Sequence, residues 1–451
     1  MDFLKNLWCT IIDWAHFREV LGMFLSAAIG SLVSWFITWI NYTKNERKRK
    51  RKLRKLHKNM KQDFGSSVIA FDTVAPCYEK RHAKMLMTNN AFIFEIPEDT
   101  KATLNSLGFK TYPAAKLDGT NAQLYAFLRE YYSEMFPTDL SIDTYLNKLI
   151  VQTANNFIQR RLANKLAFNN EQIGIDNIDI NRTGYVDGNG VEKPTLTLSL
   201  YKTDYFTAQV MVDLYKELRA IDVRRKVANP NYVSQFDNPT IQDLNQKLRP
   251  FMSSLGVGGY VIFDKGNGLE YWTVLRSPNI RNGSDDNYEL RSYSFDETMD
   301  LRDTAMDNNG RQVGSIYRGA ERATEEELGL FRGDEKVEGH LTDYHFTGLV
   351  LIRTSGEDGR PARFEMQLLG YKFAYFDETF TYQDMSFKKR MAQDAAFEAV
   401  EVYVNSLKKR LIATTGQYTH TPESVYYAEV LRGMENLRDI SNKYEEERLN
   451  L

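Results

Sequence analysis

The sequence has only two cysteines, Cys9 and Cys77, among its 451 residues. So few cysteines exclude a disulfide-built scaffold and fit a reducing compartment. The sequence also lacks a Cys/His array with metal-ligand spacing and a nucleophile elbow, which argues against a zinc site and a serine hydrolase of the α/β type. No internal repeat or long low-complexity tract is visible.

A run without any charge extends from Val20 to Tyr42 and reads VLGMFLSAAIGSLVSWFITWINY. As a helix its 23 residues extend roughly 34 Å, enough to cross a hydrocarbon core of about 30 Å. Trp35 and Trp39 stand near its C-terminal end, where amphipathic rings suit the headgroup layer. The run therefore predicts one transmembrane helix over residues 20–42. Its small residues either allow close pairing of helices or are ordinary for a span.

A basic cluster follows directly, with eleven Lys and Arg between Lys44 and Lys61 against the single acid Glu46. Positive charge beside a span marks its cytoplasmic side and attracts anionic lipid headgroups. Nucleic-acid binding is the other interpretation of a basic run, but the position beside the span favours membrane topology. We expect a basic juxtamembrane helix over residues 43–61, contact with membrane lipids, and no duplex nucleic acid as a partner.

The alternative to an anchor is a cleaved signal peptide. The apolar run is longer than a signal core of about 7–15 residues, and its basic cluster lies on the far side, so an anchor is favoured. Residues 1–19 precede the run as an amphipathic N-terminal segment. Within it, Met1 to Phe17 is interpreted as a short piece at the membrane interface, with Trp8 and Trp14 on its apolar side.

The chain after residue 61 exceeds one typical domain, and we expect two within it. Its charge balance is acidic, because the whole chain carries −2 while the first 61 residues are strongly basic. Residues 62–250 predict a mixed α/β companion domain. Apolar residues at helical spacing and one alternating strand mark its elements. The helices are expected in 102–109, 121–136, 143–168 and 209–226, and the strand is expected in 195–207.

Residues 251–385 predict a second domain rich in strands. A Gly-rich entry leads into an apolar strand ending at Asp264, and a turn leads to a second strand, so the two are expected to form a hairpin. Further strands are expected at Phe346 to Ser355 and at Ala362 to Phe376, and residues 386–451 predict a helical C-terminal region. The predicted fold class is therefore α+β, with one N-terminal transmembrane helix.

The segment from Arg318 to Leu330, RGAERATEEELGL, concentrates acids on a predicted helix that stops before Gly329. Arg322 and Glu326 stand four residues apart and are expected to pair on one face. Glu326 and Glu327 offer the oxygen ligands that a hard cation such as Mg²⁺ prefers. A solvated acidic helix end is the plainer interpretation of the same residues.

At these residues the sequence resembles the Nudix superfamily. The second half of the Nudix box is Arg-Glu, an apolar residue, any residue, Glu-Glu, any residue, Gly and an apolar residue. Arg322, Glu326, Glu327, Gly329 and Leu330 match it. The resemblance covers roughly residues 250–385 and implies a mixed-sheet Nudix-like domain over residues 251–385.

The segment departs from the box in three places. Ala323 stands where the box has a Glu that binds metal, and Thr324 replaces the usual apolar residue. Counting back from Arg322, Gly314 stands where the first Glu of the box belongs. The segment SYSFDETMD, which contains Asp296 and Glu297, is interpreted as a displaced remnant of the first half before an enlarged loop.

The order of parts narrows the resemblance. A membrane helix, a companion region containing LYKTDYFT and a degenerate Nudix domain together resemble the membrane-linked Nudix proteins of bacterial cyclic-nucleotide (CBASS-type) antiviral defence. This resemblance implies a protein at the bacterial inner membrane, with the bulk of the chain in the cytoplasm. It also implies a nucleotide or cyclic oligonucleotide ligand and a homo-oligomer.

Two functions follow as hypotheses. In the first, the domain senses a nucleotide, with Arg276, Arg318 and Arg322 as candidate phosphate ligands, and binding changes the assembly of the anchored helices. In the second, the protein is a Mg²⁺-dependent hydrolase of nucleoside diphosphate derivatives. A membrane scaffold that binds only protein is a third option.

The hydrolase hypothesis assigns residues to specific roles. Glu326 and Glu327 would bind Mg²⁺ and belong to the catalytic set, and another acid, such as Glu297, Glu321 or Glu365, would act as base. The missing Glu at position 323 favours the sensor, and the retained Glu326-Glu327 pair favours the hydrolase.

Overall fold

The structure is a computed structural model of the chain. It describes residues 40, 68–72, 82–112, 121–135, 141–163, 167–181, 195–234, 236–264, 266, 268–276, 291–328, 330–332, 335–336, 341–354, 363–375, 385–387, 399–409, 411 and 420–449. The chain divides into two compact units. Of the unit made of Met1–Lys55 and Val186–Glu192, only Ile40 is described, as a helical residue. The unit made of Leu56–Tyr185 and Lys193–Leu451 holds all the other described residues.

The predicted amphipathic segment, span and basic cluster lie outside the described residues, apart from Ile40. Within the described part of the chain, no helix is both long enough and apolar enough to cross a membrane. Anchoring by residues 20–42 therefore stays a prediction.

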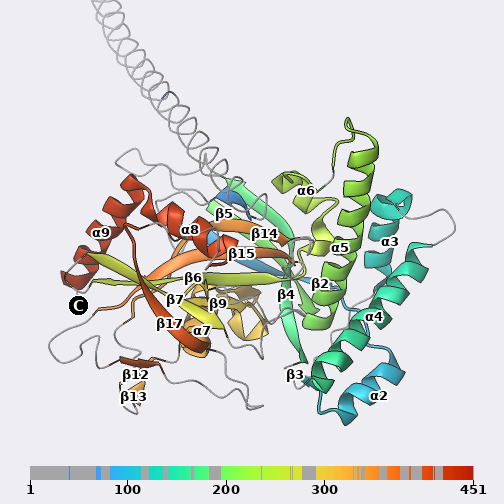
Figure 1. Cartoon of the computed structure of the whole chain (residues 1–451), viewed down its shortest axis with the longest axis horizontal. Helices are drawn as coiled ribbons and strands as arrows, with labels where there is room; N and C mark the ends of the chain where they lie inside the picture. Colours follow the sequence, from blue (N-terminus) through green and yellow to red (C-terminus); the bar gives the residue numbers. More distant parts are fainter. Residues whose placement is uncertain are drawn as a thin grey trace, which may run out of the picture. The chain divides into compact units, whose positions relative to one another are not determined.

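An eight-stranded mixed sheet forms one half of the larger unit. Its path is β1 (Val68–Asp72), β14 (His345–Thr354), β15 (Arg363–Phe373), β6 (Leu255–Asp264), β7 (Leu269–Arg276) and β17 (Ala399–Ser406), with β8 (Arg291–Ser292) beside β7 and β9 (Phe295–Thr298) beside β6. The pair β6–β15 is parallel and the other pairs are antiparallel. Figure 1 shows α8 and α9 above these strands and α7 below them.

A six-stranded mixed sheet forms the other half. Its order is β10 (Thr304–Met306), β11 (Gln312–Gly314), β2 (Ala83–Ala91), β5 (Thr195–Asp204), β4 (Phe168–Asn181) and β3 (Lys110–Tyr112). The pairs β2–β5 and β3–β4 are parallel. A small third sheet contains β13 (Glu335–Lys336), β12 (Leu330–Arg332) and β16 (Met385–Phe387).

The helices predicted from apolar spacing are present. The described α-helices are α2 (Glu98–Ser106), α3 (Asn121–Tyr132), α4 (Ile142–Leu162), α5 (Tyr205–Ala228), α6 (Ile241–Asn245), α7 (Ile316–Leu328), α8 (Pro422–Arg432) and α9 (Met434–Leu449). Ser141 caps α4 by accepting a hydrogen bond from the Thr144 amide, which satisfies one of the free N–H groups of the first turn. Helix α8 begins after Thr421 with a proline in its first turn, where the missing N–H of proline costs no helical hydrogen bond.

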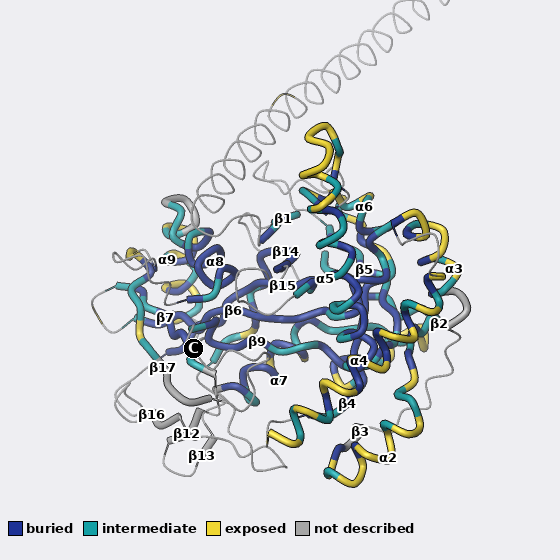
Figure 2. The backbone as a smooth tube through the Cα atoms, turned by 45° about the vertical axis from the view of Figure 1, so that its right-hand side comes forward, coloured by how far each residue is buried: buried dark blue, intermediate teal, exposed yellow. Residues whose placement is uncertain are grey.

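The predicted hairpin of β6 and β7 is confirmed. The strands expected at Phe346 to Ser355 and at Ala362 to Phe376 are present as β14 and β15, which pair antiparallel. Strand β6 is buried along almost its whole length, which the dark blue tube of Figure 2 makes visible. Glycine is required in it, because a Cβ on Gly259 would lie 2.0 Å from the Gly370 carbonyl oxygen. The core therefore centres on β6 and the strands beside it. The α+β fold class is confirmed.

Three predicted boundaries are wrong. The helix expected over 143–168 ends at Leu162, and Phe168 already begins strand β4. Residues 386–451 are not helical throughout, since Ala399–Ser406 forms strand β17 along the edge of β7. The sequence AVEVYVNS there alternates, with valine at every second position, and this β-branched pattern favours a strand. The strand predicted over 195–207 ends at Asp204, because that side chain accepts from the Thr207 amide and starts α5.

The two halves exchange strands across the predicted boundary at residue 250. Strand β1 precedes the six-stranded sheet in sequence but pairs with β14 of the eight-stranded sheet. Conversely, Val313 of β11 lies within residues 251–385 and pairs with Leu86 of β2. Each half therefore supplies backbone hydrogen bonds to the sheet of the other.

We expect the stability of the protein to depend on pH through His420. This side chain is buried, and burial together with the charge of Arg291 lowers its pKa from 6.5 to about 4. The unfolded chain takes up the proton near pH 6.5 and the folded chain only near pH 4. The free energy of unfolding therefore falls by about 3 kcal/mol as pH drops through this window.

Urea unfolding of the wild type and of His420→Gln at pH 7, 5.5 and 4 measures this effect. The carboxylates titrate alike in both proteins, so the difference between the two pH profiles isolates His420. Parallel profiles would contradict the assignment.

Candidate functional site

Helix α7 carries the residues that resemble the Nudix box. Its first turn is capped by Ser315, whose hydroxyl oxygen accepts from the Arg318 amide at 3.3 Å. Its buried face includes Ala320, Ala323 and Thr324 and packs toward β6 and β9. A Cβ on Gly319 would touch Val257 of β6 at 3.4 Å, so glycine there lets the helix lie close to the sheet.

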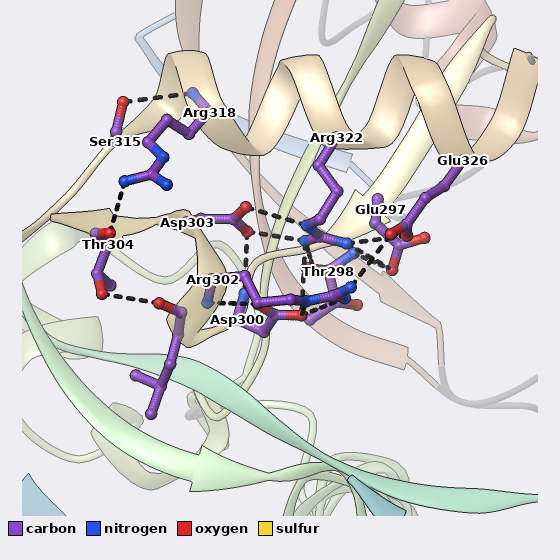
Figure 3. Close-up of polar contacts among 11 residues, drawn as sticks. Glu297, Thr298, Asp300, Arg302, Asp303, Thr304, Ser315, Arg318, Arg322 and Glu326 are labelled. Carbon is purple, nitrogen blue, oxygen red and sulfur yellow. Dashed lines mark hydrogen bonds and ion pairs between the residues drawn. The ribbon is translucent and has the colours of Figure 1, made fainter. Parts of the chain in front are cut away.

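The guanidinium of Arg322 is bound from several sides. Its Nε donates to Asp303 Oδ1 at 3.0 Å and its Nη2 donates to Asp303 Oδ2 at 2.7 Å, a bidentate pair. Nη2 also donates to the Thr298 carbonyl at 2.7 Å. One turn further along α7, Glu326 accepts from Nη1 at 3.1 Å, which confirms the predicted pairing on one face. Figure 3 shows these contacts.

A second guanidinium completes the group. Arg302 donates to Asp300 Oδ2 from Nη2 at 2.6 Å and to Glu326 Oε1 from Nη1 at 3.3 Å. Glu297 and Asp300 stand 4.0 and 3.9 Å from the Arg322 guanidinium. We name this set the Arg322 cluster. Its members are Glu297, Asp300, Arg302, Asp303, Arg322 and Glu326.

The carboxylate partners of Arg322 keep its guanidinium charged. Burial lowers the pKa of Arg322, but the hydrogen bonds and charge of Asp303, with Glu297 and Asp300, outweigh burial and raise it. Asp303 itself has only 1% of its side chain exposed. A buried charge without its partner is strongly destabilising, so Arg322 and Asp303 stabilise each other only as a pair.

The structure brings three of the predicted site residues together and leaves others apart. Glu297, Arg322 and Glu326 belong to the cluster. Arg318 is exposed and donates to the Thr304 carbonyl at 2.9 Å. Arg276 is the last residue of β7 and pairs with Ala399 of β17.

The other acids of the hydrolase hypothesis lie on different surfaces. Glu327 is on the buried face of α7, with 5% exposure. Glu321 is exposed on the same helix. Glu365 of β15 accepts from Arg363 Nη2 at 2.7 Å and belongs to another ion pair.

Sequence reasoning missed Arg302 and Asp303, and it did not single out Asp300, the last residue of the predicted remnant SYSFDETMD. Of the predicted remnant SYSFDETMD, Glu297 contacts Arg322, whereas Asp296 accepts a hydrogen bond from Gln367. Neighbouring residues of a strand point to opposite faces, which separates these two acids. The acids of DLRD, directly after the strand, were the signal that could have identified the partners of Arg322.

The described residues do not fit a resident Mg²⁺. Glu326 is engaged by two guanidinium groups, Glu327 is buried, and position 323 is a buried alanine. No group of three or more His, Cys, Asp or Glu in the described part of the chain is arranged to hold a metal ion. The cation among these carboxylates is the guanidinium of Arg322.

Comparison with known proteins places the chain in no family. No protein-family model matches the chain, and no curated protein matches it in sequence. Among solved structures, the Nudix domain of NrtR from Shewanella oneidensis, in complex with ADP-ribose, matches at 12% identity, covering 48% of this chain and 97% of that domain with a TM-score of 0.24.

We expect Arg322→Met to lower the free energy of unfolding by about 3–5 kcal/mol, because it leaves Asp303 buried without its partner. Arg318→Met on the same helix is the control, since an exposed arginine contributes about 1 kcal/mol or less. Urea unfolding measures both. Adding Asp303→Asn to Arg322→Met should restore part of the loss; an Arg322→Met protein as stable as the control would refute the pairing.

Proposed function

We propose that this chain is a membrane-anchored nucleotide sensor whose Nudix-like half binds a nucleotide signal without hydrolysing it. Binding changes the assembly of the chain at the bacterial inner membrane, as part of antiviral defence. The observation that carries the proposal is the Arg322 cluster, in which Glu326, one of the two acids expected to bind a catalytic metal, is bound to two arginines instead.

The buried face of α7 supports binding over turnover. A metal-dependent hydrolase needs carboxylates that reach the substrate phosphate through the metal. Here position 323 is an alanine with no exposed surface, and Glu327 lies on the same buried side. Only Glu326 of the three positions extends toward the surface, and it forms ion pairs with Arg302 and Arg322.

Two arginines at the surface are suited to bind phosphate. The side chain of Arg302 is 60% exposed and sits at the outer side of the cluster, and Arg318 is exposed one turn before Arg322. Arginine presents a planar set of donors that matches phosphate oxygens. Arg302 and Arg318 thus take the phosphate role, whereas Arg322, with 12% of its side chain exposed, is engaged by carboxylates.

The membrane part of the proposal is supported by the sequence. The uncharged run over residues 20–42 and the basic cluster after it suit an anchor with the bulk of the chain in the cytoplasm. A ligand shifts assembly only if it binds the assembled state more tightly than the resting state. A nucleotide bridging two copies, or closing the loop around Arg302, would supply such a difference.

One observation favours the alternative, a Mg²⁺-dependent hydrolase. The carboxylates of Glu297 and Glu326 flank the same guanidinium, and each side chain is 27% exposed. If ligand binding moved the guanidinium groups of Arg302 and Arg322 aside, the two acids would be open to a metal ion.

The first measurement is binding and turnover on the full chain in lipid nanodiscs. A panel of cyclic and linear nucleotides is tested by calorimetry with Mg²⁺ or with a chelator, and products are analysed. We expect binding that does not depend on Mg²⁺ and no product. Arg302→Gln and Arg318→Gln should each weaken binding roughly tenfold or more, the loss expected for a charged hydrogen bond.

Arg438→Gln is the matched control, since Arg438 is exposed on α9 and belongs neither to the Arg322 cluster nor to the two arginines proposed to bind phosphate. Mg²⁺-dependent product that Glu326→Gln abolishes would establish the hydrolase instead. Failure of every nucleotide to bind would refute both functions.

Replacing residues 20–42 by a soluble tag tests the anchor. We expect the tagged protein to bind nucleotide as the full chain does but to lose membrane association in fractionation and any effect on membrane integrity. Loss of binding as well would mean that assembly at the membrane is needed for recognition. Membrane association that persists without residues 20–42 would refute the anchor.

A further inference from the structure

Helix α5 ends in a tight turn. The Tyr232 amide donates to the Asn229 carbonyl at 2.9 Å, and the Asn231 amide donates to Asn229 Oδ1 at 3.1 Å. Pro230 stands at the second position of this turn, where the fixed φ of proline suits the backbone. The end of the helix is therefore followed by a defined conformation.

A buried carboxylate holds the turn against the helix. Asp222 of α5 has no exposed surface and accepts from Arg219 Nη1 at 2.9 Å and from the Tyr232 hydroxyl at 3.0 Å. The Ser234 hydroxyl donates to the same carboxylate. These contacts come from both neighbours of Val233, so they fix the backbone on either side of it.

The fixed turn presents two apolar side chains to the solvent. Val227 in the last turn of α5 is 79% exposed, and Val233 is 85% exposed. Figure 1 shows the end of α5 and the turn after it extending past the neighbouring elements, and Figure 2 colours this end yellow as exposed. We name residues 224–233 the α5 tip. Apolar side chains gathered at one projecting end are typical of a contact surface.

Positive charge surrounds these valines. Residues 223–236 contain no Asp or Glu but include Arg224, Arg225 and Lys226. Arg224 is exposed, and Arg225 donates to a neutral acceptor, the Glu134 carbonyl, at 2.6 Å. Lys226 pairs with Asp237, an acid that it shares with an arginine. Apolar residues flanked by surplus positive charge suit an anionic lipid surface, where the valines enter the headgroup layer and the arginines meet phosphates.

The middle of α5 packs beside the strand ends at which β1 begins. Val68, the first residue of β1, pairs with Ile352 of β14. The next residue of β14, Arg353, pairs with Phe364 of β15. The ring of Tyr215 in α5 lies 5.0 Å from the ring of Phe364. Helix α5 and the start of β1 therefore meet at one end of the eight-stranded sheet.

The α5 tip and the predicted basic segment both lie a short way from this point along the chain. Val227 follows Tyr215 by twelve residues, about 18 Å of helix. Lys61, the last residue of the basic cluster, precedes Val68 by seven residues, at most about 25 Å of chain. A membrane contacted by the basic segment is therefore within reach of the tip.

We propose that the α5 tip inserts Val227 and Val233 into the headgroup layer of an anionic membrane, with Arg224 and Arg225 beside the lipid phosphates. The proposal rests on the proposed function in taking the chain to be anchored at a membrane. It adds a second contact, which fixes how the bulk of the chain is oriented over the bilayer. Two valines give only a weak contact by themselves, so the tip depends on the anchor to hold it near the surface.

The test places a polarity-sensitive fluorophore on the full chain in lipid nanodiscs. Val227→Cys or Val233→Cys is labelled in a background that carries Cys9→Ser and Cys77→Ser; both valines are exposed, so the urea midpoint should not change. We expect the emission to shift to the blue in discs that contain phosphatidylglycerol, relative to discs of phosphatidylcholine alone. Leu449→Cys is the matched control, since Leu449 at the end of α9 is also 85% exposed and should give no shift.

The charge is tested with Arg224→Gln in the Val233→Cys chain. We expect the ratio of inserted to free tip to fall roughly fivefold, because one arginine near an anionic surface contributes about that factor. Arg438→Gln, at an exposed arginine of α9, should leave the ratio unchanged.

The outcomes separate this inference from the proposed function. Anchored chains whose probes at 227 and 233 do not shift would overturn the inference alone, as expected if an acidic protein covers the tip instead. An equal shift at position 449, or one that phosphatidylglycerol and Arg224→Gln leave unaltered, would overturn it too. A chain that does not enter the discs would overturn the anchor, and with it the proposed function and this inference.

Discussion

The bidentate pair between Arg322 and Asp303 is the interaction on which the arrangement of this half of the molecule depends. It joins helix α7 to Asp303, which stands 19 residues before Arg322 in the chain. The carbonyl oxygen of Asp303 accepts from the Ser315 amide at 2.8 Å, which closes the loop at the start of the helix. The two charges therefore serve to hold the helix and the loop in place more than to raise the free energy of unfolding, since a buried ion pair often gains little over apolar packing.

The same loop continues into the neighbouring sheet. From Thr304 it forms the strands β10 and β11, and Val313 pairs with Leu86 of β2. Close by, the Ile173 amide of β4 donates to the Met299 carbonyl at 3.1 Å. Backbone hydrogen bonds thus connect the loop that carries Asp303 to the six-stranded sheet.

Periodicity predicted most of the helices and the strands around β6, because these segments are long and bury one face or both. It missed β4, whose alternation is broken where Asp176 bulges out. At β17 the short run AVEVYVNS is flanked by sequence of helical composition. A stretch longer than the strand therefore mixes the strand pattern with the helical pattern around it, and the strand is missed. The pairing of Arg322 with Glu326 was predictable because it is local to one helix turn. The partner Asp303 was not, because it depends on how a loop of that length closes.

The Glu326-Glu327 motif alone suggests a metal site, whereas the fold around helix α7 does not. The surroundings of the motif determine its chemistry. A pair of adjacent glutamates on a helix suggests a metal site when the helix is considered alone. Docked on β6 and β9, helix α7 turns position 323 and Glu327 inward and leaves Glu326 beside two guanidinium groups. A metal ion there would have to displace a bidentate arginine whose pKa its carboxylate partners raise. An anionic ligand needs only the exposed donors of Arg302 and Arg318, so binding without hydrolysis is the function that this geometry favours.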